Sequence, residues 1–222
     1  MELTLTIPTD YSAITLKKWL AFTKDLKNYE GDEEATTALL LHHLCGLDPN
    51  YIKGLAVEDL NAIKTELSGF ISETELPLQR FVTIDGTEYG FEPNLSNISY
   101  GAYLDLTKWD TFTIDDNWAK LMSILYRPVT KKQGEFYSIK PYTGNIDGDK
   151  WLGVGMDVHF GALFFLLNLS TDLLSVTLKS LKEEELPAHI KSILARSGRD
   201  IPRLLNLQGE MSKNWMGLLQ NL

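Results

Sequence analysis

The sequence contains very little cysteine and histidine for a chain of 222 residues. Cys45 is the only cysteine, so no disulfide bond can form within the chain, which excludes a small disulfide-stapled scaffold. A chain of this length should bury roughly 70% of its unfolded surface, so it needs neither disulfides nor a metal to fold. With 44% apolar and 23% charged residues, its composition is that of an ordinary globular protein.

The sequence also lacks a long hydrophobic run. Its most apolar stretch, Phe160–Leu169, has about half the length that a helix needs to span a bilayer, which favours a buried helix. Residues 1–8 alternate polar and apolar side chains, a pattern typical of a strand and not of a secretory signal. We therefore expect synthesis in a reducing cytoplasm and no membrane anchor.

No motif for metal, nucleotide or nucleophilic chemistry is complete. His42, His43 and Cys45 could supply half of a zinc site, but the sequence offers no second ligand pair, and adjacent helical residues point about 100° apart. The Asn145–Asp149 segment lacks the glycine position and the final glutamate of a calcium loop and predicts a turn. Neither a phosphate-binding glycine pattern nor a Gly-x-Ser-x-Gly motif occurs. We expect no cofactor, no metal and no enzymatic activity; an acid–base site built from dispersed carboxylates stays open as an alternative.

Positive charge is scarce except near the C-terminus. The whole chain carries a net charge of −9, but residues 186–222 hold five basic and two acidic side chains, a net of +3, which leaves −12 on residues 1–185. An acidic body repels phosphate at long range, which argues against nucleic acid as the main partner. The basic segment could fold back on this body or engage an acidic neighbour, and the simpler alternative is a solvated helix.

Helical periodicity dominates the first third of the chain. Asp32 is placed to cap a helix that Gly46 ends, and Pro49 stands where the first turn of a short helix accepts proline. The expected helices are Ile14–Leu26, Ala35–Cys45, Leu47–Ile52 and Val57–Phe70.

Two β-hairpins and further helices are expected beyond residue 76. Asp85-Gly86, between two β-rich runs, is the strongest turn signal, and a second pair of runs turns near Gln133-Gly134. Ser99 is expected to cap one helix, and Asp115 or Asp116 another, which Arg127-Pro128 would stop. A glycine-rich loop is expected over residues 144–155. The expected elements are the hairpins Phe81–Phe91 and Val129–Lys140 and the helices Tyr100–Trp109, Trp118–Tyr126, Val158–Lys182, Glu183–Ser197 and Ile201–Leu222.

Together these elements predict an α+β fold dominated by helices, with two short β-hairpins and an amphipathic C-terminal helix. Residues 1–185 are expected to form one compact body, helical over 1–72 and mixed over 76–185. Residues 186–222 are expected to form a separate basic amphipathic segment.

This basic segment is the best candidate for partner binding in the sequence. Basic side chains precede a cluster of one tryptophan, one methionine and two leucines, a composition that either docks on the chain's own body or inserts in a partner's groove. The candidate residues, called the tail residues below, are Arg196, Arg199, Arg203, Trp215, Met216, Leu218 and Leu219.

The middle of the chain resembles a known class of proteins. The segments Tyr89–Leu95, Tyr100–Leu106 and Asn117–Lys131 carry the resemblance, together with the opening pattern from Ile14 and the Tyr137–Tyr142 segment. Over roughly residues 11–170 the chain is similar to virion-assembly proteins of tailed phages, in particular tail-region or tail-assembly-chaperone-like proteins of phages infecting Bacteroidota, including crAss-like phages. The quoted motifs are structural and bring no catalytic residues with them.

The resemblance implies a non-enzymatic phage protein that binds other virion proteins, as an assembly chaperone or as a structural or packaged component. It implies a location in the host cytoplasm or in the virion, and homo-oligomerisation is open. Two alternatives remain: a phage protein that binds a host factor for takeover or anti-defence, and a cytoplasmic enzyme or small-molecule binder with a pocket around residues Gly144–Asp157.

Overall fold

A computed structural model describes residues 7–29, 32–71, 76–109 and 113–183, and it shows an α+β fold in which helices predominate. The expected fold class is confirmed. The tail residues and the helices expected over 183–197 and 201–222 lie outside the described residues, apart from Glu183, and so does most of the strand expected at residues 1–8. The division into a body over 1–185 and a tail stays a prediction.

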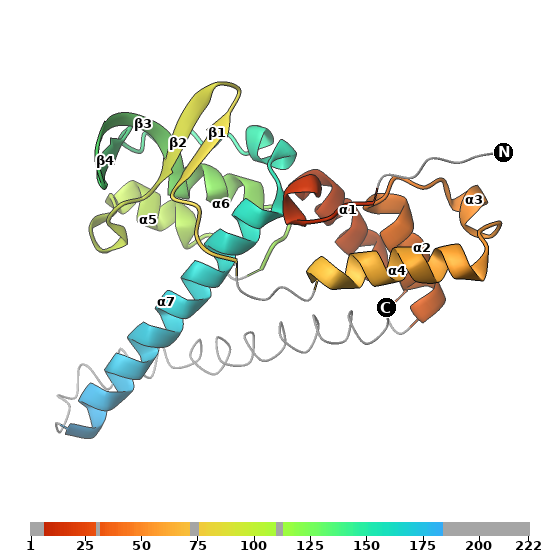
Figure 1. The fold of residues 1–222 in the computed structure, drawn as a ribbon. Coiled ribbons are helices and arrows are strands. Elements are labelled where there is room, and N and C mark those ends of the chain that lie inside the picture. The colour runs from red at the N-terminus through yellow and green to blue at the C-terminus, as the bar shows by residue number, and fades with distance from the viewer. Residues whose placement is uncertain (1–6, 30–31, 72–75, 110–112, 184–222) are drawn as a thin grey trace.

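Four helices form the first part of the molecule (Figure 1). Local caps explain where they begin: Thr15 Oγ1 accepts from the Lys18 N–H, and Asp32 Oδ1 accepts from the Ala35 N–H at 2.9 Å. Gly46, with φ +72°, ends the second helix as expected, because its N–H reaches the His42 carbonyl in a left-handed cap. The helices are α1 (Leu16–Leu26), α2 (Glu33–His43), α3 (Pro49–Ile52) and α4 (Val57–Ile71).

The two expected hairpins join in one antiparallel sheet with strand order β1-β2-β3-β4. Asp85 and Gly86 both have positive φ, 50° and 74°, which is the backbone of a tight hairpin turn matched to strand twist. Gly134, with φ +59°, lies in the second turn. The strands are β1 (Phe81–Ile84), β2 (Thr87–Phe91), β3 (Tyr126–Gln133) and β4 (Phe136–Ile139).

The junction between α6 and β3 corrects the sequence prediction. Helix α6 (Trp118–Leu125) ends one residue early, and Arg127-Pro128 does not follow a helix as a stop but lies inside β3. Pro128 stands opposite Tyr89 of β2, and the ladder with β4 shifts register just beyond it, as expected where proline removes a donor. Pro128 favours an extended backbone at Arg127, and at this position the extended backbone belongs to a strand.

Ser99 caps α5 (Tyr100–Leu106) as expected, but the predicted cap of α6 is wrong. The N-cap residue of α6 is Asn117, and Asp115 stabilises the turn before it by accepting the Asn117 N–H at 2.7 Å. Asp115, two residues before this N-cap, accepts a backbone N–H as a capping residue does. The sequence alone therefore did not distinguish position 115 from position 117 as the cap.

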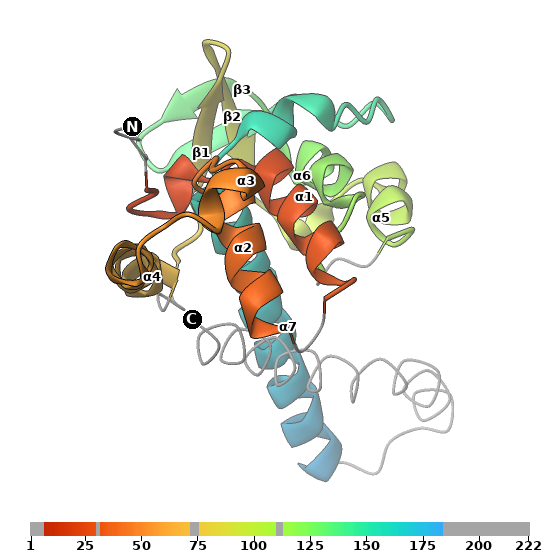
Figure 2. The ribbon, with the colours of Figure 1, turned by 90° about the vertical axis from the view of Figure 1, so that its right-hand side faces the viewer.

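Helix α7 (Met156–Glu183) is the longest described helix and confirms the prediction of Val158–Lys182. Its first turns lie in the centre of the molecule, whereas its C-terminal part extends beyond the other described elements (Figures 1 and 2). Gly161 lets the segment before β1 approach α7, since a Cβ at this position would lie 2.5 Å from the Pro77 carbonyl oxygen.

One hydrophobic core draws on both parts of the chain. Trp118, Trp151 and Tyr126 are its largest buried side chains from the mixed part, and Phe22 and Leu41 come from α1 and α2. A backbone bridge fixes the two parts together, because the Leu16 N–H donates to the Val154 carbonyl at 3.0 Å and the Met156 N–H to the Ile14 carbonyl at 2.8 Å. No helix among the described residues combines the length and the apolar character required to cross a membrane.

Candidate functional site

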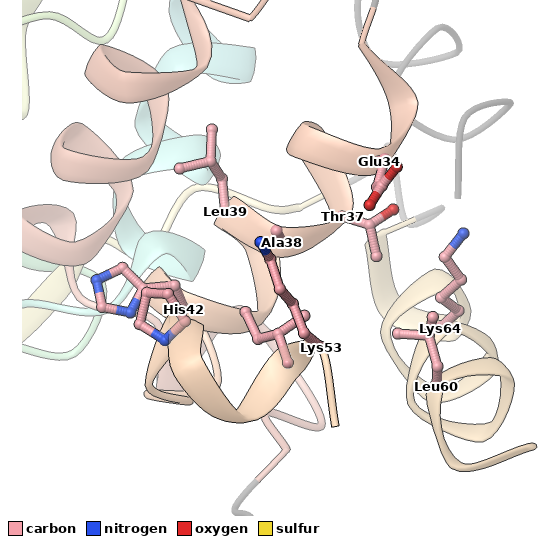
Figure 3. Close-up of a pocket in the computed structure, with 10 residues that line it drawn as sticks. Glu34, Thr37, Ala38, Leu39, His42, Lys53, Leu60 and Lys64 are labelled. Carbon is pink, nitrogen blue, oxygen red and sulfur yellow. The ribbon is translucent and has the colours of Figure 1, made fainter. Parts of the chain in front are cut away.

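An apolar groove of about 600 Å³ lies between α2, α3 and α4 (Figure 3). Its volume falls within the range of roughly 300–1,000 Å³ that ligand-binding clefts occupy. Half of its ten lining residues are aliphatic, and three of the others are charged. The lining residues are Glu34, Thr37, Ala38, Leu39, His42, Pro49, Ile52, Lys53, Leu60 and Lys64.

The groove exists because α2 carries apolar residues on two sides. Leu40, Leu41 and Leu44 are buried in the core, whereas Ala38 and Leu39 are only partly buried and line the groove. Asp48 and Pro49 set the start of α3, with the Asp48 carboxylate accepting the Asn50 N–H at 2.8 Å, and so hold Ile52 at the groove.

Figure 3 shows how the charged side chains are arranged around the groove. Lys64 and Leu60 project from α4 toward α2, and Lys53 is the residue that follows the end of α3. Within the described part of the chain, neither lysine has a carboxylate oxygen within 4 Å. Glu34 is the one carboxylate among the lining residues, so their net charge is positive on an otherwise acidic body.

The two adjacent histidines of α2 make separate structural bonds. His42 Nδ1 lies 2.9 Å from the Leu47 carbonyl oxygen, and His43 Nε2 lies 2.9 Å from Asp25 Oδ2. In the described parts of the chain, no three His, Cys, Asp or Glu side chains are grouped so that they could hold a metal ion. The bond from His42 fixes the turn that leads into α3 at one end of the groove.

Cys45 packs in the core beyond α2. Its side chain is buried, and this burial raises the pKa of the thiol to about 11. A thiol in this setting carries almost no thiolate at neutral pH, which is the form that attacks substrates and binds metals.

The predicted glycine-rich loop over residues 144–155 contains a short 3₁₀ helix, Asp149–Gly153, within an otherwise irregular path. Asp147, in the segment where a turn was expected, holds Lys150 at 3.0 Å. This loop borders a second, smaller hollow beside β3, which is more polar in its lining than the groove.

Sequence reasoning did not identify the groove. The tail residues that it favoured lie outside the described residues, so their role in partner binding stays a prediction. The only hint of the groove in the sequence is the mixture of small and apolar residues on the second side of α2. Comparison with protein-family models, with curated proteins and with solved structures found no match.

Proposed function

We propose that this chain is a non-enzymatic protein of a tailed phage that binds another virion protein, as an assembly chaperone or as a structural component of the particle. Two things support the proposal: the resemblance over roughly residues 11–170, and the apolar groove between α2, α3 and α4. The groove is the main observation behind the proposal, because a hollow of this size with aliphatic side chains in half of its lining suits the apolar face of a helix.

The chemistry of the groove selects the partner segment. Ala38, Leu39 and Leu60 offer aliphatic contact, so the partner presents aliphatic or aromatic anchors at helical spacing. Lys53 and Lys64 have no carboxylate within 4 Å in the described chain, so acidic residues flanking those anchors complete the contact. The occupant is therefore an acidic amphipathic helix of a virion or assembly protein.

A binding assay with paired substitutions on α4 tests this proposal. The full chain is assayed for binding to the proteins that neighbouring genes of the same phage genome encode. Leu60→Asp places a charge in the groove, whereas Val57→Asp changes the same helix at a residue that is 73% exposed and outside the lining. We expect Leu60→Asp to weaken binding at least about tenfold and Val57→Asp less than twofold.

Both variants are checked by circular dichroism, so that loss of the fold is not read as loss of the groove. If Leu60→Asp unfolds, Ala38→Glu gives the same test from α2. Binding of a virion protein that neither groove variant weakens would contradict the proposal. So would a groove-dependent partner that is encoded by the host, since this result favours a takeover or anti-defence function.

We expect the tail residues to make an additional contact with the same partner. Truncation after Pro202 removes Arg203 and the cluster from Trp215 to Leu219. We expect the truncated chain to keep its fold and to bind the partner more weakly. Unchanged affinity with an unchanged fold would exclude a role for this part of the tail.

A further inference from the structure

A second hollow, of about 350 Å³, lies beside the start of β3 and is separate from the groove. Residues from β2, α6, β3 and the loop over 140–150 line it, so segments distant in the sequence meet there. Three of the lining side chains are cationic, namely Arg127, Lys140 and Lys150. Asp147 is the one carboxylate among the lining residues. This is an unusual concentration of positive charge for a body whose residues 1–185 carry −12.

Two of these cations are held in place by their neighbours. Lys150 Nζ lies 3.0 Å from Asp147 Oδ2 and 5.4 Å from the centre of the Tyr89 ring, and its side chain keeps 26% of its surface exposed. Arg127 pairs with Glu92 through one amino group only, and its side chain is 11% exposed. A cation held at a partly buried wall acts through a lower dielectric than a free surface lysine.

Donor capacity is left over in this hollow. Arg127 donates to Glu92 through Nη2, and its Nε is enclosed by protein without a partner among the described residues, so only the remaining N–H donors of this guanidinium can face the hollow. Lys140 is exposed and has no carboxylate within 4 Å in the described chain. Tyr142 adds no negative charge, because burial and its bond to Asp105 at 2.5 Å raise the pKa of the phenol to about 12.

We infer that this hollow binds an oxyanion, the phosphate or carboxylate group of a small molecule, through Lys140, Lys150 and Arg127. N–H donors from different side chains that line one hollow suit a group with two or three acceptor oxygens. The rings of Tyr89 and Tyr142 offer apolar walls for the rest of such a molecule. This site does not depend on the groove or on the proposed virion partner.

Calorimetric titration of the full chain with pyrophosphate and with citrate tests the inference. Sodium chloride at the same ionic strength is the reference, because nonspecific screening affects all exposed charges alike. Lys140→Glu is compared with Lys131→Glu, which makes the same change of net charge at an exposed lysine of β3 outside the lining. We expect Lys140→Glu to weaken binding of at least one anion about tenfold or more, and Lys131→Glu less than threefold.

Preference for pyrophosphate would support the inference with phosphate as the natural group, and preference for citrate would support it with carboxylate. The inference is overturned if neither anion binds above the sodium chloride reference. It is also overturned if Lys140→Glu and Lys131→Glu weaken binding equally, since the anion then responds to net charge and not to this hollow. Equal melting temperatures of the two variants show that the comparison concerns binding.

Discussion

At the scale of single residues, the best-defined polar group of the core is His159. It is fully buried between two tryptophans: the Trp118 Nε1–H donates to its Nδ1 at 3.2 Å, and its Nε2 lies 3.2 Å from the Trp151 carbonyl oxygen. This arrangement fixes the neutral ring with the proton on Nε2, the nitrogen that donates. Burial disfavours the charged form and lowers the pKa of His159 to about 4.

His159 should make the protein less stable as the pH falls. Its pKa is about 4 in the folded chain against an ordinary 6.5, so the unfolded chain binds more protons between these values. The stabilisation is fully present above pH 6.5 and is lost progressively toward pH 4. From pH 7 to pH 5 we expect His159 to remove about 2 kcal/mol of unfolding free energy. Urea titrations at both values measure this, and in His159→Gln that share of the pH dependence should disappear.

The buried thiol of Cys45 should react very slowly in the folded protein. With its pKa raised to about 11, the thiolate fraction at pH 8 is on the order of 100-fold below that of a free cysteine. We expect labelling by a chromogenic disulfide reagent to be at least about 100-fold slower than in guanidinium chloride, where the chain is unfolded. Labelling at comparable rates under the two conditions would show that Cys45 is accessible.

At the scale of elements, most features that were predicted correctly from the sequence depend on local chemistry, although the equally local cap of α6 was not predicted correctly. The Asp32 and Ser99 caps, the Asp85-Gly86 turn and the glycine that ends α2 each depend on residues within one turn, and each was placed correctly. The strand start at Tyr126 was missed because its ladder partner, Phe91, lies far away in the sequence. The groove was missed for the same reason: α2, α3 and α4 create it only once they pack.

Two glycines in helices should respond to alanine in opposite directions. In α7, a Cβ at Gly161 would lie 2.5 Å from the Pro77 carbonyl oxygen, so Gly161→Ala forces the loop away and costs about 1–3 kcal/mol. In α4, a Cβ at Gly69 meets no described atom within 4 Å, so Gly69→Ala gains about 0.5–1 kcal/mol from helix propensity. Chemical denaturation of both variants measures the difference. A stabilised Gly161→Ala would show that the loop does not pack on α7.

At the scale of the whole molecule, the first helices and the mixed part share one core. Phe160 of α7 packs edge-on against Trp19 of α1 and Tyr11, with ring centres 5.2 and 5.0 Å apart. The backbone bridge between Thr15 and Gly155 lies at the same junction. Neither part can bury these aromatic faces without the other, so separate folding would expose them to water.

We therefore expect the chain to unfold in one cooperative transition, with far-ultraviolet circular dichroism and tryptophan fluorescence giving the same midpoint. Gly155→Ala tests the junction, because its Cβ would lie 2.7 Å from the Ser12 carbonyl oxygen, and it should cost about 1–3 kcal/mol by both probes. Gly153→Ala is the matched control, since its Cβ meets no described atom within 4 Å. Two separated midpoints in either variant or in the natural chain would mean that the parts fold independently. If both probes give one midpoint, and Gly155→Ala lowers it whereas Gly153→Ala does not, the bridge between residues 12–16 and 154–156 couples the groove-bearing helices to the sheet.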